Sequence, residues 1–357
     1  MSKTPTYEKA YIDFDTVLYR AAKSVQQETI LVSHIPTGDN FSFSGVTEFR
    51  GRKKYEDGGW IYEQNLLRKD QNLPLYKRED FVVTPIQALK DVPADKDNLV
   101  EWAMELIDYK VGAIKKAMDS ETYVLGIGGA TNFRFEAAHI KPYKGQRPPK
   151  PLIFESLREA FVQKYKNKVS VSREGMEQDD EISIRGWESY FHHQRTGKWK
   201  YVLGYIDKDL IMTPCPHWNY DKAEEGIVVP TINECCLAFC CQLLTGDVAD
   251  NIQGLPDIPN SLREEYGIRK GKGCGKETAL KLLGGCSSPV EMFTNVVVAY
   301  KAYYGLEPFL FVSHRGVEME RTWLDMLKEN ALLLYMMRKP HERYDIENTF
   351  KRLGVEY

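Results

Sequence analysis

Carboxylate side chains are concentrated in the segment Gly175–Ser183. Within it, Glu177, Asp179, Asp180 and Glu181 place four carboxylates in five positions. Carboxylates at this density repel one another unless their pKa values rise, a Lys or Arg pairs with them, or a cation binds. An acidic run is also common in the first turn of a helix, where the macrodipole favours negative charge. Taken alone, the segment therefore favours a structural role at the start of a helix.

Three further acidic pairs recur along the chain after apolar runs: Asp13 with Asp15, Asp207 with Asp209, and Asp247 with Asp250. Each pair alone could be a helix cap or a turn. In parallel α/β sheets, however, ligand sites gather at the carboxyl ends of the strands. Carboxylate oxygens are hard donors that suit Mg²⁺ or Mn²⁺ better than zinc or copper. Together the pairs predict a divalent-metal site.

A basic segment, residues 139 to 173, lies immediately before the acidic cluster. Prolines interrupt its first half, and the apolar spacing of Ile153, Leu157 and Phe161 predicts a helix in its second half. A solvated charged face is one explanation of the basic residues. A flexible basic loop beside an acidic cluster is also what a phosphodiester next to metal ions would require.

The hydrophobic pattern predicts the elements that position these residues. Residues 10–19 are expected to form a strand running into a helix, 97–120 a helix, 122–128 a buried strand and 199–206 another strand. Helices are also expected at 176–185, 231–244, 291–304 and 323–337. The order implies a β-α-β unit with a right-handed crossover. Residues 28–95 are expected to be irregular with a hairpin.

Glycines at 254, 271, 273 and 275 indicate a helix-hairpin-helix, whose second helix starts near Lys276. Backbone N–H groups in such a turn favour a DNA phosphate without reading the base sequence. The Gly-x-Gly-Lys run lacks the spacing of a nucleotide-binding loop.

The composition limits the classes of protein to which this chain can belong. With 357 residues, 43% hydrophobic and 28% charged, the chain is an ordinary globular protein large enough for two domains. Its net charge of −3 means that any basic surface must be local. No apolar run reaches the roughly 18 residues of a membrane span, and the polar start is no signal peptide, so a cytoplasmic protein is expected. The seven cysteines are expected to be reduced thiols, not zinc ligands.

The motif order resembles the 5′-nuclease (flap endonuclease) family over about residues 10 to 285, most closely bacteriophage 5′-3′ exonucleases and the 5′-nuclease domain of bacterial DNA polymerase I. The motifs are Asp13, Arg134, Tyr143-Lys144-Gly-Gln-Arg147, Glu177-x-Asp179-Asp180, Asp207-Lys-Asp209, Gly246-Asp247-x-x-Asp250 and Gly273-x-Gly275-Lys276-x-Thr278. The resemblance implies an α/β fold with a PIN-like core: a mostly parallel sheet flanked by helices within residues 1–230, with a basic arch at 139–173. It further implies a helical region at 231–357 that contains the helix-hairpin-helix at about 246–285.

The resemblance also implies the roles of site residues. One metal ion would lie among Asp13, Glu177, Asp179 and Asp180, and a second among Asp207, Asp209, Asp247 and Asp250. Lys144, Arg147 and Arg134 would contact the scissile phosphate, and further DNA contacts would come from Tyr143, Lys141, Lys150, Gly273, Gly275, Lys276 and Thr278. The implied cofactors are two Mg²⁺ or Mn²⁺ ions, with K⁺ as a further ion at the hairpin. Glu181 matches no family position and is expected to be a solvated charge.

Two departures from the family pattern stand out. The family usually has an Asp in the strand before Phe133-Arg134, whereas this chain has Gly126-Ile-Gly-Gly129. We hypothesise that Asp15 replaces that carboxylate. The second departure is an insertion, Pro259–Lys270, inside the hairpin region.

The expected function is a metal-dependent 5′-3′ exonuclease or flap endonuclease. It would be a monomer acting in phage replication, in the host cytoplasm, on duplex, nicked or flap DNA or on RNA–DNA hybrid. One alternative is a PIN-type ribonuclease or an RNase H-like activity. Another is a haloacid-dehalogenase-type phosphatase. The run Asp13-Phe-Asp-Thr-Val17 resembles the opening motif of that family, in which Asp13 would be the nucleophile. A third is a DNA-binding module with an inactive site.

Overall fold

The computed structural model describes residues 6–52, 58–206, 208–269 and 271–357. The chain divides into two compact units. The first unit combines residues 1–16, 112–149 and 167–357, and the second combines residues 17–111 and 150–166. This division differs from the expected boundary at residue 230, because the first unit continues through both predicted regions.

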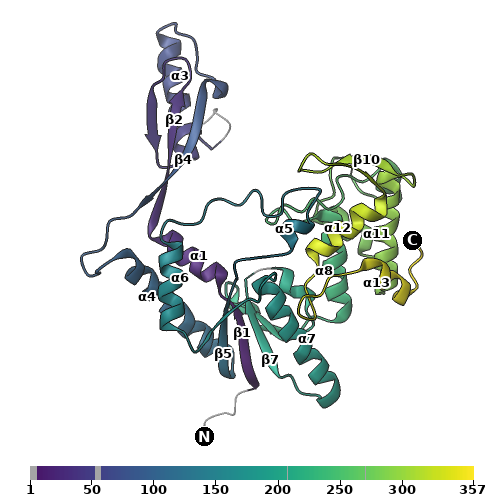
Figure 1. Ribbon diagram of the computed structural model, residues 1–357. Helices are drawn as coiled ribbons and strands as arrows, with labels where there is room; N and C mark the ends of the chain where they lie inside the picture. Colours follow the sequence, from purple (N-terminus) through teal and green to yellow (C-terminus); the bar gives the residue numbers. More distant parts are fainter. Residues whose placement is uncertain (1–5, 53–57, 207, 270) are drawn as a thin grey trace. The chain divides into compact units, whose positions relative to one another are not determined.

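A mostly parallel sheet forms the centre of the first unit. Its strand order over the described residues is β6-β5-β1-β7-β8-β9. β1 lies between β5 and β7 and runs parallel to both (Figure 1). The bounds are β1 Tyr7–Asp13, β5 Ser120–Ile127, β6 Val169–Val171, β7 Tyr201–Tyr205, β8 His217–Asn219 and β9 Ile227–Val228. The predicted α/β fold with a mostly parallel sheet flanked by helices is confirmed.

Helix α7, Gln178–Thr196, packs against β1 and β7. It begins with a capping box in which Asp180 accepts from the backbone N–H of Glu177, and it ends at Gly197, whose φ of 71° favours glycine. The sequence prediction of a helix at 176–185 gave its beginning, but the helix extends further. The short helix α5, Arg134–Ala137, follows β5.

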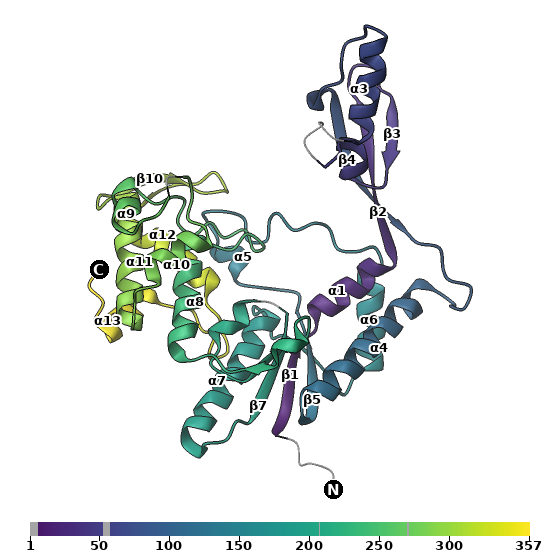
Figure 2. The same cartoon turned by 180° about the vertical axis from the view of Figure 1, so that it is seen from behind.

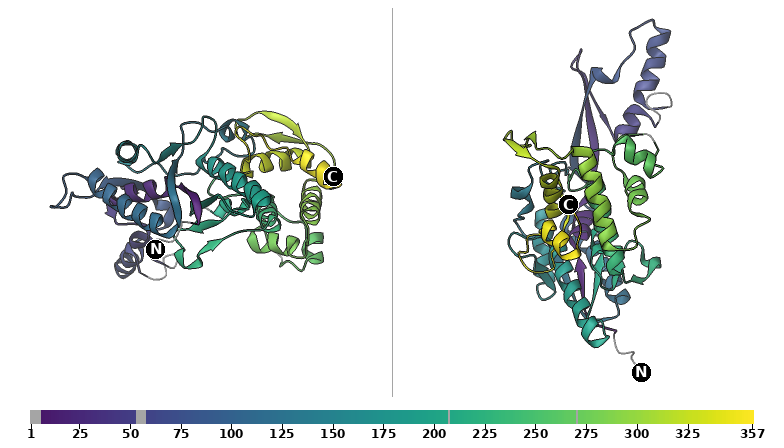
Figure 3. Two further views of the ribbon diagram at one scale, coloured as in Figure 1. Left: turned by 90° about the horizontal axis from the view of Figure 1, so that it is seen from below. Right: turned by 90° about the vertical axis from the view of Figure 1, so that its right-hand side faces the viewer.

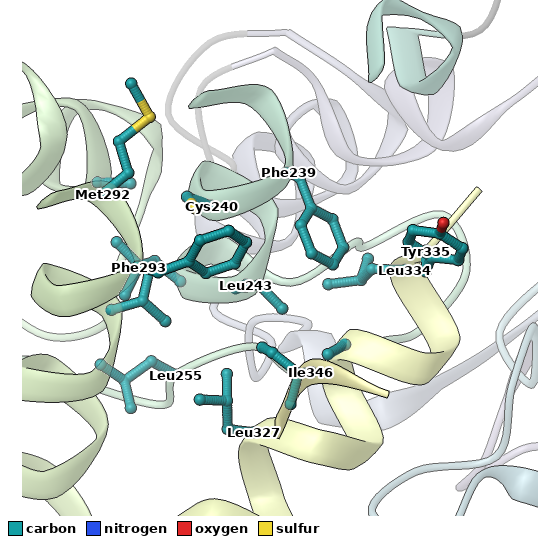
Figure 4. Close-up of a cluster of buried hydrophobic side chains, with 14 of the residues drawn as sticks. Phe239, Cys240, Leu243, Leu255, Met292, Phe293, Leu327, Leu334, Tyr335 and Ile346 are labelled. Atoms are coloured by element: carbon teal, nitrogen blue, oxygen red, sulfur yellow. The ribbon is translucent and has the colours of Figure 1, made fainter. Parts of the chain in front are cut away.

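The remaining helices of the first unit form one helical layer, seen from behind in Figure 2 and in two further views in Figure 3. They are α8 Ile232–Thr245, α9 Asn260–Glu265, α10 Lys276–Leu283, α11 Pro289–Tyr304, α12 Trp323–Leu334 and α13 Ile346–Leu353, with a hairpin of β10 Phe309–Val312 and β11 Glu318–Arg321. Their core contains Phe239, Leu243, Phe293 and Leu327 (Figure 4). Burying each such side chain stabilises the fold by about 1.5–3 kcal/mol. The predicted helices at 231–244, 291–304 and 323–337 are confirmed, with small differences in their ends.

The second unit contains most of α1, Asp15–Ser24, and of α4, Leu99–Ala117, together with α6, Phe154–Lys164. It also contains an antiparallel sheet of order β3-β2-β4, formed by β2 Gln26–His34, β3 Asn40–Phe43 and β4 Phe81–Leu89, with helices α2 Val46–Arg50 and α3 Trp60–Asp70. The expected hairpin is present, because β2 and β3 pair in antiparallel orientation, but the expectation that the rest of this segment would be irregular was wrong. β2 pairs with β4 from Gln26 to His34, and Phe43, Phe49 and Phe81 pack beneath the sheet with Trp60 against them.

Short 3₁₀ helices occupy Arg78–Asp80, Lys208–Met212 and Ala223–Glu225. All seven cysteines are free thiols, as predicted. Burial raises the pKa of Cys274 to about 12, so this thiol stays protonated at neutral pH. Within the described ranges, no helix is both long and apolar enough to cross a bilayer.

His217 in β8 gives the first testable prediction. Its imidazole is fully buried against Tyr205, with a ring-centroid distance of 4.9 Å, and neither ring nitrogen has a hydrogen-bond partner among the described residues. Burial lowers the pKa of His217 to about 4 from an ordinary value of 6.5. As the pH falls, His217 therefore takes up a proton at a higher pH in the unfolded chain than in the folded protein. Stability that is present above pH 6.5 is lost as pH falls toward 4, by about 2–3 kcal/mol at pH 4.5.

The check is urea unfolding of the natural protein and of His217→Phe at pH 7 and at pH 4.5. The variant should lose about 2–3 kcal/mol less on acidification, because its aromatic ring cannot take up a proton. An equal loss in both proteins would show that other groups carry the acid sensitivity.

Candidate functional site

A buried ion pair lies at the start of α7. Asp180 is 0% exposed and accepts two hydrogen bonds from the guanidinium of Arg134, at 2.7 and 2.9 Å. Asp180 also accepts the backbone N–H of Glu177 at 3.1 Å and that of Met337 at 3.2 Å. The carboxylate is thus fully surrounded by donors. We refer to these two side chains as the Arg134–Asp180 pair.

Arg134 is 2% exposed and also binds the C-terminal end of α12 and the residue after it. Its Nε donates to the carbonyl of Leu333 at 2.9 Å, and Nη2 donates to the carbonyl of Tyr335 at 2.7 Å. Burial alone would lower the pKa of Arg134, but the charge and hydrogen bonds of Asp180 outweigh burial and raise it. The expected phosphate contact of Arg134 and the expected metal contact of Asp180 do not match this placement, because the two side chains face each other in the interior.

A second network joins the basic loop to the acidic residues. The hydroxyl of Tyr143 lies 2.8 Å from a carboxylate oxygen of Glu177 and 2.6 Å from one of Asp250, and its single hydrogen is shared between these two acceptors. The ammonium of Lys144 binds Glu177, and Arg147 donates to Asp250 at 2.7 Å. The structure thus brings together five residues that the sequence analysis proposed for the site.

The electrostatics of this network keep Glu177 ionised. Burial alone would raise the pKa of Glu177, but the charges of Lys144 and Arg134 and the hydrogen bonds outweigh it and lower the pKa below its ordinary value. Burial, followed by the neighbouring charges of Glu177 and Asp250, raises the pKa of Tyr143 well above 10. Tyr143 is therefore neutral, and its hydroxyl links the carboxylates of Glu177 and Asp250.

Backbone contacts fix the basic loop against the loop that follows α8. The N–H of Lys144 donates to the carbonyl of Asp250 at 2.8 Å, and the side chain of Asn251 donates to the carbonyl of Pro142 at 2.9 Å. Lys144 and Asn251 both have a positive φ, 55° and 58°. Such a conformation is uncommon outside glycine and is maintained here by the reciprocal contacts.

Asp13 and Asp15 lie where β1 passes into α1. Asp13 is buried at the end of the strand, and its carboxylate accepts the N–H of Asp15 at 3.2 Å. Asp15 accepts the N–H of Gly128 at 2.8 Å. A Cβ at Gly128 would lie 2.9 Å from the Asp15 carboxylate, so the glycine makes room for it. Asp15 thus occupies the region after β5 where the expected family carboxylate is missing.

The other acidic pairs come from the loops after β7 and α8. Asp247 is buried, accepts the N–H groups of Ala249 and Asp250, and pairs with the ammonium of Lys208 at 3.1 Å. Asp209 accepts from the amide nitrogen of Gln242 at 2.5 Å. Asp179 is half-buried in the first turn of α7, and Asp207 lies outside the described residues.

The donors in this region are suited to a hard divalent cation. In the part of the chain that the structure describes, no three Asp, Glu, His or Cys side chains converge closely enough to ligate a metal ion. Two buried amide oxygens, of Gln178 and Gln242, nevertheless lack a hydrogen-bond partner there, and the surrounding groups are carboxylates. Neutral and charged oxygens are the ligands that Mg²⁺ and Mn²⁺ prefer.

The segment predicted to be a helix-hairpin-helix contains the helices α9 and α10 among its described residues. α9 lies within the part that the sequence analysis treated as an insertion. Arg263 of α9 is buried and donates to the carbonyls of Ile258 at 2.9 Å, Arg269 at 3.0 Å and Gly273 at 3.0 Å. Its charge is balanced by Asp257 at 2.7 Å, which also accepts the N–H of Gly273 at 2.9 Å.

These contacts do not fit the K⁺ ion expected at the hairpin. Three carbonyl oxygens converge in this loop, and all three already accept from one guanidinium. A cation placed among them would meet the like charge of Arg263. The guanidinium of Arg263 therefore takes the place among these carbonyls where a K⁺ ion was expected.

The remaining predicted residues have varied positions. Lys141, Gly275 and Lys276 are exposed, and Gly273 and Thr278 are half-buried. Lys150 belongs to the second unit, where it pairs with Glu155 at 2.6 Å. Glu181 is not the solvated charge that was expected, because its side chain is largely buried and accepts the N–H of Arg173 at 3.1 Å.

The sequence analysis did not identify three residues that contribute to this region: Gln178, Gln242 and Glu329. Glu329 of α12 accepts the N–H groups of His139 and Ile140, both at 2.6 Å, and pairs with Arg321 at 2.7 Å. It therefore anchors the start of the basic loop. A charged residue within an apolar helix was the available signal for Glu329, and an uncharged polar residue inside an acidic run was the signal for Gln178.

Comparisons with known proteins find weak likenesses to solved structures. No family model and no curated protein matches the sequence. Among solved structures, the bacteriophage T5 D15 protein co-crystallised with metal ions has 15% identical residues and a TM-score of 0.31, covering 55% of this chain and 81% of that one. A variant of T5 D15 flap endonuclease in a complex with DNA and metal ions has 16% identity and a TM-score of 0.32, covering 55% and 79%. A T5 5′-exonuclease mutant has 15% identity and a TM-score of 0.30, covering 55% and 80%.

The Arg134–Asp180 pair predicts a large effect on stability. Asp180→Ala should lower the free energy of unfolding by about 3–5 kcal/mol, because it leaves a buried guanidinium without its counter-charge. The measurement is urea denaturation at neutral pH. The matched control is Glu155→Gln, which breaks the exposed Lys150–Glu155 pair and should cost less than about 1 kcal/mol. Equal losses in the two variants would contradict the structural role of the pair.

The hairpin predicts independence from K⁺. Replacing Na⁺ by K⁺ at constant ionic strength should change neither the thermal midpoint nor the affinity for duplex DNA, since Arg263 already fills the carbonyl cluster. Arg263→Met should lower the thermal midpoint, because three buried carbonyls lose their donor. Differential scanning fluorimetry and fluorescence anisotropy in the two salts test this. A K⁺-specific increase in the affinity of the natural protein would contradict it.

Proposed function

We propose that this chain is a metal-dependent nuclease that hydrolyses phosphodiester bonds of DNA, with the 5′-3′ exonuclease or flap-endonuclease polarity that its motif order implies. The observation that carries the proposal is the network at the start of α7. There the basic loop residues Lys144 and Arg147 are held against Glu177 and Asp250. A cationic loop beside a dense group of carboxylates suits a phosphodiester that is bound next to divalent cations.

The carboxylates would hold the cations. Asp13, Asp15, Asp179 and Glu177 come from the carboxyl end of β1 and from the starts of α1 and α7, and Asp247 and Asp250 come from the loop after α8. Divalent cations bound there would lower the pKa of a water molecule and stabilise charge on the phosphate. They would also relieve the repulsion among these carboxylates.

Lys144 and Arg147 would neutralise the substrate. Both now pair with carboxylates of the site. Cations bound at Glu177 and Asp250 would compete for these carboxylates and release the two basic side chains toward the phosphate. Arg147 can bind a phosphate through two N–H groups, and Lys144 acts as a compact charge.

The hairpin would bind the duplex away from the reacting bond. α10 begins at Gly275 without a side-chain cap, and the exposed Lys276 is the first residue of the helix. Uncapped N–H groups at a helix start bind phosphate and do not read the base sequence. The ion pair of Arg263 with Asp257 stabilises the loop that precedes this helix start.

The test compares the natural protein with Asp179→Asn on 5′-labelled and 3′-labelled duplex, nicked and flap DNA with Mg²⁺. The variant should cleave at least about a hundredfold more slowly, the scale of losing one preorganised electrostatic group. Its affinity for DNA in Ca²⁺ should stay within about threefold, because the hairpin and the basic loop remain.

Asp108→Asn, which removes a partner of Lys164 in the second unit, is the control and should cleave normally. Parallel assays with RNA, RNA–DNA hybrid and p-nitrophenyl phosphate distinguish the other hydrolases that the sequence motifs allow. Unchanged turnover by Asp179→Asn would falsify the assignment of the site. Cleavage of RNA alone would contradict the proposed substrate.

A further inference from the structure

Gln178 is a buried polar residue that the proposed chemistry has not used. It is the first residue of α7, between Glu177 and Asp179, and it is 6% exposed. Its amide oxygen has no hydrogen-bond partner among the described residues. A buried oxygen without a donor is costly, so such groups in folded proteins usually bind something.

Gly126 shows where this amide lies. A Cβ built at Gly126 would be 1.9 Å from the amide nitrogen of Gln178 and 3.1 Å from its oxygen, so the carboxamide fills the space of a side chain on β5. Gly126 is the register partner of Asp13 in the parallel pair of β5 with β1. Paired residues of neighbouring parallel strands point to the same face of the sheet, about 5 Å apart. The carboxamide therefore lies beside the side chain of Asp13.

Gly128 is the first residue after β5. The carboxylate of Asp15 lies over Gly128 as the amide of Gln178 lies over Gly126. Two glycines therefore make room for one carboxamide and one carboxylate next to the carboxylate of Asp13.

The backbone donors along this edge are already engaged. The N–H of Phe14 donates to the carbonyl of Gly126, the N–H of Asp15 to Asp13, and the N–H of Gly128 to Asp15. Ionised carboxylates accept hydrogen bonds and cannot donate them. A cation is the partner that all three side-chain oxygens can share.

We propose that the amide oxygen of Gln178 is a ligand of the divalent cation held by Asp13 and Asp15. The proposal rests on the proposed function and assigns a neutral ligand to that site. A neutral oxygen contributes less electrostatic attraction than a carboxylate, so the site binds its cation more weakly than a site with a third carboxylate would.

The experiment measures Mn²⁺ binding by the electron paramagnetic resonance signal of free Mn²⁺, and the thermal midpoint with and without Mn²⁺. Gln178→Met keeps the length of the side chain and removes the oxygen, so the Mn²⁺ affinity should fall about tenfold or more. Gln178→Glu should be less stable than the natural protein without metal, because it adds a third carboxylate. It should bind Mn²⁺ more tightly and show a larger increase in thermal midpoint when Mn²⁺ is added.

The matched control is Gln26→Met. Gln26 has the same residue type and the same 6% exposure, but its oxygen accepts the N–H of Leu152 in the second unit. Its Mn²⁺ affinity should equal that of the natural protein. If Gln178→Met fails to fold, the metal-dependent shift of Gln178→Glu decides the question.

The outcomes separate this assignment from the proposed function. If Gln178→Met keeps its Mn²⁺ affinity and loses the same thermal stability with and without Mn²⁺, Gln178 only fills space and the assignment is overturned, although the natural protein still cleaves DNA. If the natural protein binds no Mn²⁺, the assignment is likewise overturned. If both variants shift the Mn²⁺ affinity as expected while no DNA is cleaved, the ligand assignment stands and the nuclease proposal fails.

Discussion

The rest of the site depends on the buried Arg134–Asp180 pair. One guanidinium connects three stretches of chain: α5, the start of α7, and the C-terminal end of α12, through the carbonyls of Leu333 and Tyr335. Each group compensates the burial of the other, whereas either alone would leave a charge in the interior. Because Asp180 also accepts the N–H of Glu177, the pair fixes the direction in which α7 begins and so the positions of Glu177 and Gln178.

The charged residues of the first unit near the start of α7 fall into two groups with different roles. The Arg134–Asp180 pair is internal and stabilises the fold. Arg147 is about half exposed, whereas Lys144 is largely buried against Glu177, and both pair with carboxylates of the candidate site. The same residue types therefore serve structure or chemistry according to their burial, as the different environments of Asp180 and Asp250 show.

Sequence alone predicted the elements whose patterns are local. The continuous apolar run of β7 and the acidic helix start of α7 are visible in a single segment, and the acidic and basic groups were found by spacing. The sheet of the second unit was missed because β2 pairs with β4, which is far away in the sequence. The aromatic core under this sheet also comes from several separate segments. The role of Arg134 could not be predicted either, since its acceptors Leu333 and Tyr335 are backbone carbonyls, which every residue has. The unpartnered oxygen of Gln178 likewise becomes visible only with the register of β1 and β5.

The contacts of α12 and the segment after it bear on when the site forms during synthesis. Arg134 and the basic loop are translated early, but their partners are Asp250, Glu329, Leu333 and Tyr335. A ribosome-bound chain that has emerged only as far as α11 already carries Asp250, but Arg134 lacks its two carbonyl acceptors and the start of the basic loop lacks Glu329. The contacts around Arg134 and the basic loop are therefore complete only after Tyr335 has emerged, long after these residues themselves.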